Sequence, residues 1–212
     1  MPPRAPRKIN LGSGKDFRPE YLNIDINDYW SPDVIANVSA DFPRADGGTY
    51  PTQRFGDIVI APGAFDEIMS NDVLEHVPDL VATMTSCLKV LRLGGVFNIS
   101  VPYDLSYGAW QDPTHLRAFN ERSWLYYTDW FWYLGWTEAR FVLRKLEYKA
   151  SELGHSMLNG GTTQEIVVRT PRGIDSMSVT LEKIPLSDKD RTALASFTDG
   201  RKRNQALSQA PA

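Results

Sequence analysis

Short apolar segments, separated by glycine, proline and polar residues, mark the first half of the chain. Each has the length of a buried strand and is bounded by residues that favour turns. The pattern predicts strands at residues 9–11, 21–26, 34–38, 67–70 and 96–101. From Leu80 to Leu91 the apolar side chains recur at spacings of three and four, which predicts a helix that Gly94 and Gly95 end. Because a strand, a helix and a strand at this length form a parallel crossover, the sequence predicts the α/β class.

The second half of the chain is richer in aromatic residues and contains two further strand patterns. A helix is predicted from Asn120 through the aromatic stretch to Gly135, with core packing and a dimer contact as its roles. Strands are predicted at residues 141–148 and 177–181. In the second of these, apolar and polar residues alternate, as in an antiparallel strand with one face in water. Residues 154–163 are rich in glycine and are predicted to form a mobile loop.

Composition and charge narrow the class of protein. The 212 residues, 42% of them hydrophobic, suffice for one domain with a full core, which we place at residues 9–186. Residues 1–8 are predicted to form a flexible arm, residues 43–57 a long loop, and residues 187–212 a poorly ordered polar tail. A net charge of −3 argues against a protein that binds nucleic acid through a basic face. The single cysteine, Cys87, excludes an internal disulfide. No apolar run reaches the roughly 20 residues of a membrane span, so we expect a cytoplasmic protein.

A glycine loop, Gly-Ser-Gly at residues 12–14, follows the first predicted strand. Glycine has no Cβ, so such a loop lets the backbone approach a ligand closely. A phosphate-binding Walker A loop is excluded, because Lys15 is followed by Asp16 where that loop needs serine or threonine. A dinucleotide fingerprint fits poorly, because Phe17 occupies the place of its third glycine and the acidic residue Asp25 comes too early.

Four phrases in the first half of the chain resemble the class I methyltransferases that depend on S-adenosyl-L-methionine (SAM). They are Ile-Asn-Leu-Gly-Ser-Gly at 9–14, Tyr-Leu-Asn-Ile-Asp-Ile at 21–26, Asn-Asp-Val-Leu-Glu-His-Val at 71–77 and Leu-Arg-Leu-Gly-Gly-Val-Phe at 91–97. The resemblance covers about residues 8–104. It implies a Rossmann-like, mostly parallel seven-stranded sheet with one antiparallel strand and helices on both faces. It also implies SAM as the cofactor.

The resemblance further implies which residues bind SAM. In this family the glycine loop passes under the methionine part of SAM, and an acidic residue at the end of the second strand binds the ribose hydroxyls. An acidic residue after the third strand lies by the adenine amine, and the loop after the fourth strand brackets the methionine part. The residues implied in this chain are Gly12, Ser13, Gly14, Asp25, Asp41, Phe42, Asn71 and Asp72. The chain departs from the family at Asp16, where another glycine is usual, and in a first helix of one turn at most. A subgroup that acts on sugars and glycan-like molecules is shortened there too.

The loop after the fifth predicted strand is expected to face the methyl group of SAM, because ligands of doubly wound sheets bind at the carboxyl ends of the strands. The phrase Asp-Pro-Thr-His at 112–115, followed by arginine and an aromatic residue, also occurs in that subgroup. His115 is predicted to be the base that takes the proton of an acceptor hydroxyl, with Asp112 fixing its tautomer. The residues expected to contact the acceptor are Tyr103, Tyr107, Trp110 and Arg117.

The function expected is SAM-dependent O-methylation of a small polar acceptor, a saccharide first. Two alternatives stay open: transfer to a nitrogen or a phenol in a natural-product pathway, and a binding module that keeps the fold without turnover. His76 is assigned a structural or cofactor-positioning role. No metal site is predicted, although Asp104, Asp112 and His115 could hold a hard divalent ion.

Overall fold

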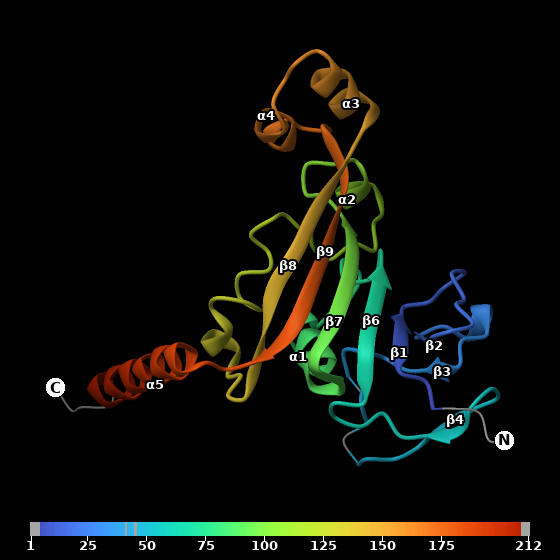
Figure 1. Cartoon of the computed structure of the whole chain (residues 1–212), viewed down its shortest axis with the longest axis vertical. Coiled ribbons are helices and arrows are strands. Elements are labelled where there is room, and N and C mark those ends of the chain that lie inside the picture. The colour runs from blue at the N-terminus through green and yellow to red at the C-terminus, as the bar shows by residue number, and fades with distance from the viewer. Residues whose placement is uncertain (1–4, 41, 45, 209–212) are drawn as a thin grey trace.

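A seven-stranded sheet forms the centre of the computed structural model, which describes residues 5–40, 42–44 and 46–208, with side chains to residue 201. The strands lie in the order β3-β2-β1-β6-β7-β9-β8 (Figure 1). Their bounds are β1 Lys8–Leu11, β2 Leu22–Asp25, β3 Val34–Ile35, β6 Phe65–Asn71, β7 Leu91–Pro102, β8 Ala139–Ala150 and β9 Ile174–Pro185. Neighbouring strands pair in parallel except at β9, which is antiparallel to both β7 and β8. The predicted mostly parallel sheet with one antiparallel strand is confirmed.

Helices and one small hairpin connect these strands. The α-helices are α1 Leu80–Val90, α2 Gly108–Gln111, α3 Glu152–Asn159, α4 Gln164–Arg169 and α5 Asp188–Ser208, and the 3-10 helices are η1 Asp28–Trp30 and η2 Phe131–Leu134. Strands β4 Tyr50–Thr52 and β5 Gly56–Ile58 form the hairpin, which lies in the stretch predicted to be a loop. Of the helices in the described part of the chain, none has both the length and the apolar character that crossing a bilayer requires.

The middle strands of the sheet are buried on both faces. Ile9 of β1 pairs with Leu22 of β2 on one side and with Ile68 of β6 on the other, and all three side chains are inaccessible to solvent. Parallel strands covered on both faces read as nearly continuous apolar runs, which is why these strands could be found in the sequence. No helix occurs between β1 and β2, in agreement with the predicted limit of one turn.

Helix α1 begins where Asp79 caps it and ends earlier than predicted. The Asp79 side chain accepts a hydrogen bond of 2.8 Å from the backbone N–H of Ala82, as an N-cap residue does. The chain enters β7 directly at Leu91, so Gly94 and Gly95 lie inside that strand. Gly94 has a φ of +74°, which produces an irregular start to β7 rather than a helix end.

The aromatic stretch is not the predicted helix. It forms successive turns that end in η2, and its large side chains are packed into the core, with Trp124 and Phe131 fully buried. The ring of Phe119 stacks on that of Trp124 at a centroid distance of 5.5 Å. Aromatic residues lose rotamer freedom in a helix, so packing on several sides outweighs helix formation here.

Two segments predicted to be mobile or poorly ordered are helices in the structure. Residues 154–163 contribute most of α3, whose N-terminus is capped by Ser151 Oγ accepting from the N–H of Gly154 at 3.0 Å. In the predicted tail, α5 starts at a reciprocal capping pair: Ser187 Oγ accepts from the N–H of Asp190, and Asp190 Oδ2 accepts from the N–H of Ser187. The serine and the acidic residue three positions later are a sequence signal for a helix start, so the tail prediction is wrong for residues 188–208.

Helix α5 projects away from the sheet (Figure 1) and packs against η2. Asp190 forms an ion pair of 3.0 Å with Arg140 of β8, and the ring of Phe197 lies 4.8 Å from that of Tyr133. At the other end of the chain, residues 1–4 of the predicted arm lie outside the described residues. Arg7 of that arm is held by two hydrogen bonds to Asp66.

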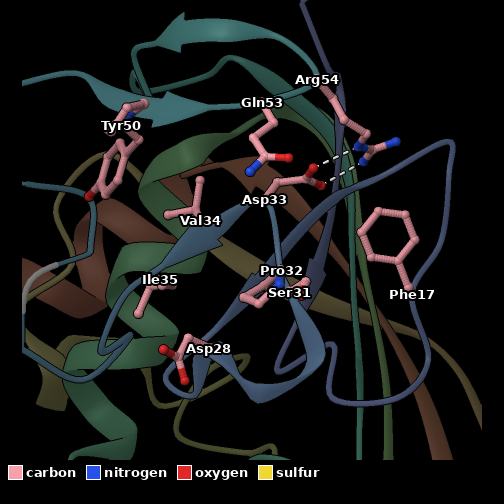
Figure 2. A pocket seen from close by; sticks show the side chains of 11 residues that line it. Phe17, Asp28, Ser31, Pro32, Asp33, Val34, Ile35, Tyr50, Gln53 and Arg54 are labelled. Atoms are coloured by element: carbon pink, nitrogen blue, oxygen red, sulfur yellow. Dashed lines mark hydrogen bonds and ion pairs between the residues drawn. The ribbon is translucent and has the colours of Figure 1, made fainter.

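A buried ion pair supports the free edge of the sheet beside β3. The Asp33 side chain is 4% exposed, and Arg54 donates to its two carboxylate oxygens at 2.6 and 2.5 Å. Figure 2 shows this pair at the wall of a cavity of about 550 Å³, with Phe17 beside the guanidinium group. Burial alone would raise the pKa of Asp33, but the hydrogen bonds from Arg54 and Asn23 outweigh it and lower the pKa. All these polar groups have partners within the protein, so the pair is a structural feature.

Replacing Asp33 by asparagine is expected to lower the free energy of unfolding by about 1 kcal/mol at pH 6. A carboxyl whose pKa is lower in the folded state stabilises the fold above its unfolded pKa, near 4, and this contribution is lost as the pH falls. The difference between wild type and Asp33→Asn should therefore shrink at pH 3, as measured by urea unfolding. An equal difference at both pH values would contradict the ion-pair explanation.

Candidate functional site

A cavity of about 350 Å³ lies at the carboxyl ends of β1, β2 and β6. This is the edge at which doubly wound sheets bind their ligands. Its lining combines the glycine loop, the end of β2, the segment after β3 and the turn after β6. The lining residues are Gly12, Gly14, Asp25, Ile26, Ala36, Asn37, Val38, Ser39, Asp72, Val73, His76, Val77 and Pro78. Four of the residues predicted to bind the cofactor are thus brought together around one cavity.

The carboxylate of Asp25 is fixed by the loops on either side of it. One oxygen accepts a hydrogen bond of 2.8 Å from the N–H of Gly14, and the other accepts one of 2.8 Å from the N–H of Asn27. A carboxylate oxygen can accept two hydrogen bonds, so each oxygen keeps capacity for a hydroxyl donor. Asp25 at the cavity wall could therefore bind a pair of neighbouring hydroxyls.

The other predicted cofactor residues are placed differently. Asp72 lines the cavity with a φ of +52°, whereas Asn71 pairs with Ser100 in the sheet and is not among the lining residues. Ser13 is buried, and its Oγ has no hydrogen-bond partner among the described residues. Phe42 is packed in the core and does not line the cavity. The adenine-side prediction also named Asp41, which lies outside the described residues.

The two glycines of the loop have left-handed backbones but different surroundings. Gly12 has a φ of +64°, and a Cβ added to it would lie 2.3 Å from a methyl carbon of Val73. Gly14 has a φ of +45°, and a Cβ added there would meet nothing within 4 Å, on the side of the cavity. Gly12 is therefore required by packing, whereas Gly14 leaves room for a ligand.

Gly12→Ala is expected to be less stable than Gly14→Ala by about 1–3 kcal/mol, the usual cost of overpacking. Both variants share the strain of alanine in a left-handed conformation, so their difference isolates the clash with Val73. Gly14→Ala should instead weaken SAM binding, because its methyl group would enter the cavity. Urea unfolding and calorimetry with SAM measure the two effects; equal stabilities of the variants would rule out the clash.

Next to the cavity, Glu75, His76 and His115 form a cluster, named here the Glu75 cluster. One donor atom of each residue lies within 4.8 Å of those of the other two. The ring of His76, at the cavity wall, packs edge-on against that of His115 at a centroid distance of 4.5 Å. Glu75 is 1% exposed, and neither carboxylate oxygen reaches a donor of another described residue. Burial raises the pKa of Glu75 to about 7.

Hydrogen bonds orient both imidazole rings of the cluster. Nδ1 of His115 lies 3.0 Å from the carbonyl oxygen of Ala109, which can only accept, so this nitrogen carries a proton. Thr114 Oγ1 donates its proton to Asp112 at 2.7 Å and therefore accepts from Nδ1 of His76 at 2.9 Å. In the neutral form of both histidines the lone pair is therefore on Nε2.

The predicted pairing of His115 with Asp112 needs correction. Asp112 Oδ2 lies 4.0 Å from His115 Nε2, which is beyond hydrogen-bond distance. The carbonyl of Ala109 fixes the tautomer of His115 instead. Asp112 accepts from the N–H and the hydroxyl of Thr114, and so orients His76 through that residue.

The residues expected at the acceptor also fall into two groups. Tyr107 and Trp110 are exposed on the loop after β7, and Trp110 Nε1 donates to the carbonyl of Asp104 at 3.0 Å. Tyr103 is buried, and its hydroxyl donates to Glu121 at 2.8 Å. The guanidinium group of Arg117 donates to the carbonyls of residues 74, 77 and 78. These hydrogen bonds hold the turn after β6 in place, which favours a structural role for Arg117 over the predicted contact with the acceptor.

Sequence reasoning missed Glu75 as a functional residue. Glu75 lies between Leu74 and His76 in the segment 71–77 quoted above, but the sequence does not distinguish a buried glutamate from an exposed one. The side chain is buried by the fold of the turn after β6. In that turn the backbone carbonyl of Glu75 accepts a hydrogen bond of 2.8 Å from the N–H of Leu116. The Leu-Glu-His order next to a predicted cofactor loop was the one available signal.

The sequence is similar to known methyltransferases over its first half. Residues 11–99, fewer than half of the chain, match the methyltransferase domain family. Over 94 residues, or 41% of the chain, the sequence is 31% identical to a protein of Mycolicibacterium smegmatis named as a probable SAM-dependent methyltransferase. That alignment covers 34% of the relative, so the chain spans about a third of the relative's length.

Solved structures with this fold are similar over most of the chain. One is a chain of the complex between the Trm112 methyltransferase activator and a methyltransferase from Haloferax volcanii, with a TM-score of 0.51 and 13% identity, covering 82% of this chain and 81% of that one. Another is a SAM-dependent methyltransferase from Archaeoglobus fulgidus, with a TM-score of 0.48 and 16% identity, covering 84% of this chain and 87% of that one. At 13% identity, the similarity to the Haloferax structure concerns the fold alone. Residues 11–99, which include the glycine loop and the end of β2 at the cavity, are thus the part of the chain that is similar to the methyltransferase domain family, and the strand order agrees with that similarity.

Proposed function

We propose that this domain transfers the methyl group of SAM to a hydroxyl of a small polar acceptor, with a saccharide as the first candidate. The observation that carries the proposal is the continuity between the cavity and the Glu75 cluster. Gly14 and Asp25 line the cofactor end of the cavity, and His76, which lines it too, packs against His115. Cofactor and acceptor could thus meet at the His76 wall.

Methyl transfer needs alignment more than acid catalysis. The carbon–sulfur bond of SAM breaks as the oxygen–carbon bond forms in line with it, and the bond's electron pair stays on sulfur, which leaves as a neutral thioether. Holding the two reactants in line can contribute about 7–11 kcal/mol. An alcohol is a poor nucleophile until it loses its proton, so a group that activates the hydroxyl is also needed. We assign this task to the Glu75 cluster, with His115 as the catalytic residue and Asp112 as a positioning residue.

Exposed aromatic residues on the acceptor side support a saccharide. Trp110 and Tyr107 are 67% and 61% exposed, and the ring of Tyr107 also packs under the guanidinium group of Arg172. Aromatic side chains combine a large apolar surface with low conformational entropy. A sugar ring presents C–H groups on one face and hydroxyls at its edge, which suits a flat aromatic surface beside polar side chains.

A screen of glycan, phenol and amine acceptors with labelled SAM tests the proposal. Label on a glycan hydroxyl is the expected result, and label on amines alone would overturn it in favour of an N-methyltransferase. Calorimetry with SAM and with its demethylated product tests the remaining alternative. If neither ligand binds, the chain is a binding module that keeps the fold. The cytoplasmic location, the absence of nucleic-acid and membrane partners and the homodimer contact expected from the sequence stay predictions.

A further inference from the structure

The carboxylate of Glu75 lacks the partners that the carboxylate of Asp33 has. The Asp33 side chain, 4% exposed, receives two hydrogen bonds from Arg54 and a further one from the backbone of Asn23. Both oxygens of Glu75 are buried and receive no hydrogen bond from another described residue. A buried carboxylate without a partner is costly, so such a group calls for a proton or a cation beside it.

The two histidines present matching lone pairs. As the hydrogen bonds of the cluster show, Nδ1 of His115 donates to the Ala109 carbonyl and Nδ1 of His76 donates to Thr114, so the neutral form of each ring carries its lone pair on Nε2. Histidines that bind metal ions commonly donate their other ring N–H to a carbonyl or to a hydrogen-bonded polar group in this way. A proton on Glu75 would satisfy one of these lone pairs, whereas a cation would satisfy the carboxylate and both rings together.

We propose that Glu75, His76 and His115 bind a divalent first-row transition-metal ion. Two imidazoles and one carboxylate are the donors that zinc, iron, cobalt and nickel ions accept, in contrast to the all-oxygen sets of calcium and magnesium. Donor atoms within 4.8 Å of one another are close enough to converge on one ion after small side-chain rotations. The site differs from the one considered in the sequence analysis, because Glu75 and His76 take the places of Asp104 and Asp112.

The metal site is argued independently of the proposed function. The role of the ion in methyl transfer, in contrast, rests on that function. Three protein ligands leave positions open, and a bound hydroxyl becomes more acidic there. The acceptor hydroxyl would lose its proton to water while bound to the ion, and its oxygen would then take the methyl group as the carbon–sulfur bond breaks. When the ion is bound, His115 would act on the hydroxyl indirectly, as a ligand of the ion. An acceptor with neighbouring hydroxyls could fill two open positions, which favours a sugar diol.

The test is calorimetry of Zn²⁺ binding to the full chain, free of any affinity tag and stripped of metal with a chelator. Wild type is expected to bind one Zn²⁺ per chain, and Glu75→Gln and His115→Ala at least tenfold more weakly. His155→Ala is the matched control, because His155 is exposed on α3 and lies outside the cluster, and it should bind as wild type does. No binding by wild type, or equal binding by Glu75→Gln, would overturn the proposal.

Thermal unfolding separates lost binding from misfolding. Zn²⁺ should raise the melting temperature of folded Glu75→Gln less than that of wild type and His155→Ala, because a ligand stabilises the native state in proportion to how tightly it binds it. An equal rise in Glu75→Gln would contradict the site.

The two proposals fail in different ways. SAM binding and methyl transfer that persist in the presence of the chelator would exclude the ion from the reaction and leave the proposed function. If Zn²⁺ binding is weakened in Glu75→Gln and His115→Ala as expected, but wild type does not bind SAM, the metal site would stand and the proposed function would be contradicted.

Discussion

Replacing His115 by alanine is expected to lower turnover by about 10²–10⁴-fold, the usual effect of losing a group that activates a nucleophile. The ring is held by the Ala109 carbonyl and packs against His76 at the cavity wall, so its loss removes a group beside the acceptor while the glycine loop and Asp25 stay in place. SAM affinity should therefore stay within a few-fold of wild type. Steady-state kinetics and calorimetry on the same preparation measure both quantities.

Asp112→Asn is the graded comparison for His115→Ala. Its carboxylate lies 4.0 Å from His115 Nε2 and acts on the cluster through Thr114, so this variant should lose less turnover than His115→Ala. A His115→Ala enzyme within a few-fold of wild type would exclude His115 from the reaction. Alignment alone, or Asp72 at the cavity wall, would then have to account for the rate.

Replacing Asp25 by alanine is expected to weaken SAM binding about 10- to 150-fold. The variant would lose charge-assisted hydrogen bonds worth about 1.5–3 kcal/mol, and each 1.4 kcal/mol corresponds to a factor of ten in affinity. Folding should change little, because the carboxylate supports only the N–H groups of Gly14 and Asn27 near the surface. Calorimetric titration with SAM gives the affinity directly.

Asp28→Ala provides the matched control for Asp25→Ala. Asp28 is an exposed acidic residue three positions later, in η1, and it lines the cavity beside β3 instead of the one at the glycine loop. The control should bind SAM as wild type does. Unchanged affinity in Asp25→Ala would remove Asp25 from the cofactor site.

The sheet could be predicted from the sequence because its middle strands are buried on both faces. Such strands carry uninterrupted apolar runs, as at Ile9 and Ile68, and the alternation in β9 marked the antiparallel strand. The aromatic stretch was harder to predict, because Trp124 and Phe131 are buried in the common hydrophobic core without lying on the apolar face of a helix. The start of α5 at Ser187 and Asp190 was visible in the sequence, but the polar composition of the following residues favoured a disordered tail.

The sequence predicted the candidate site only where its residues lie within one short, continuous segment of the chain. The glycine loop and Asp25 belong to phrases that resemble the methyltransferase family, and the structure brings them to one cavity. The Glu75 cluster joins two turns about 40 residues apart, and the role of Arg117 depends on carbonyls of a different loop. Such contacts arise from the sheet order, which places the ends of β6 and β7 side by side, and spacing along the chain does not encode them.

The bonds between the turn after β6 and the loop after β7 have a kinetic consequence. Arg117 spans the carbonyls of Leu74 and Pro78, and the N–H of Leu116 is bonded to the carbonyl of Glu75. One of the two joined segments lines the cavity at the glycine loop, and the other carries Tyr107 and Trp110, for which we propose contact with the acceptor. A cofactor that rigidifies the first segment therefore also rigidifies the second, before any acceptor arrives. The two substrates should bind in order, SAM first, and the Leu116 amide should exchange its hydrogen more slowly once SAM alone is bound.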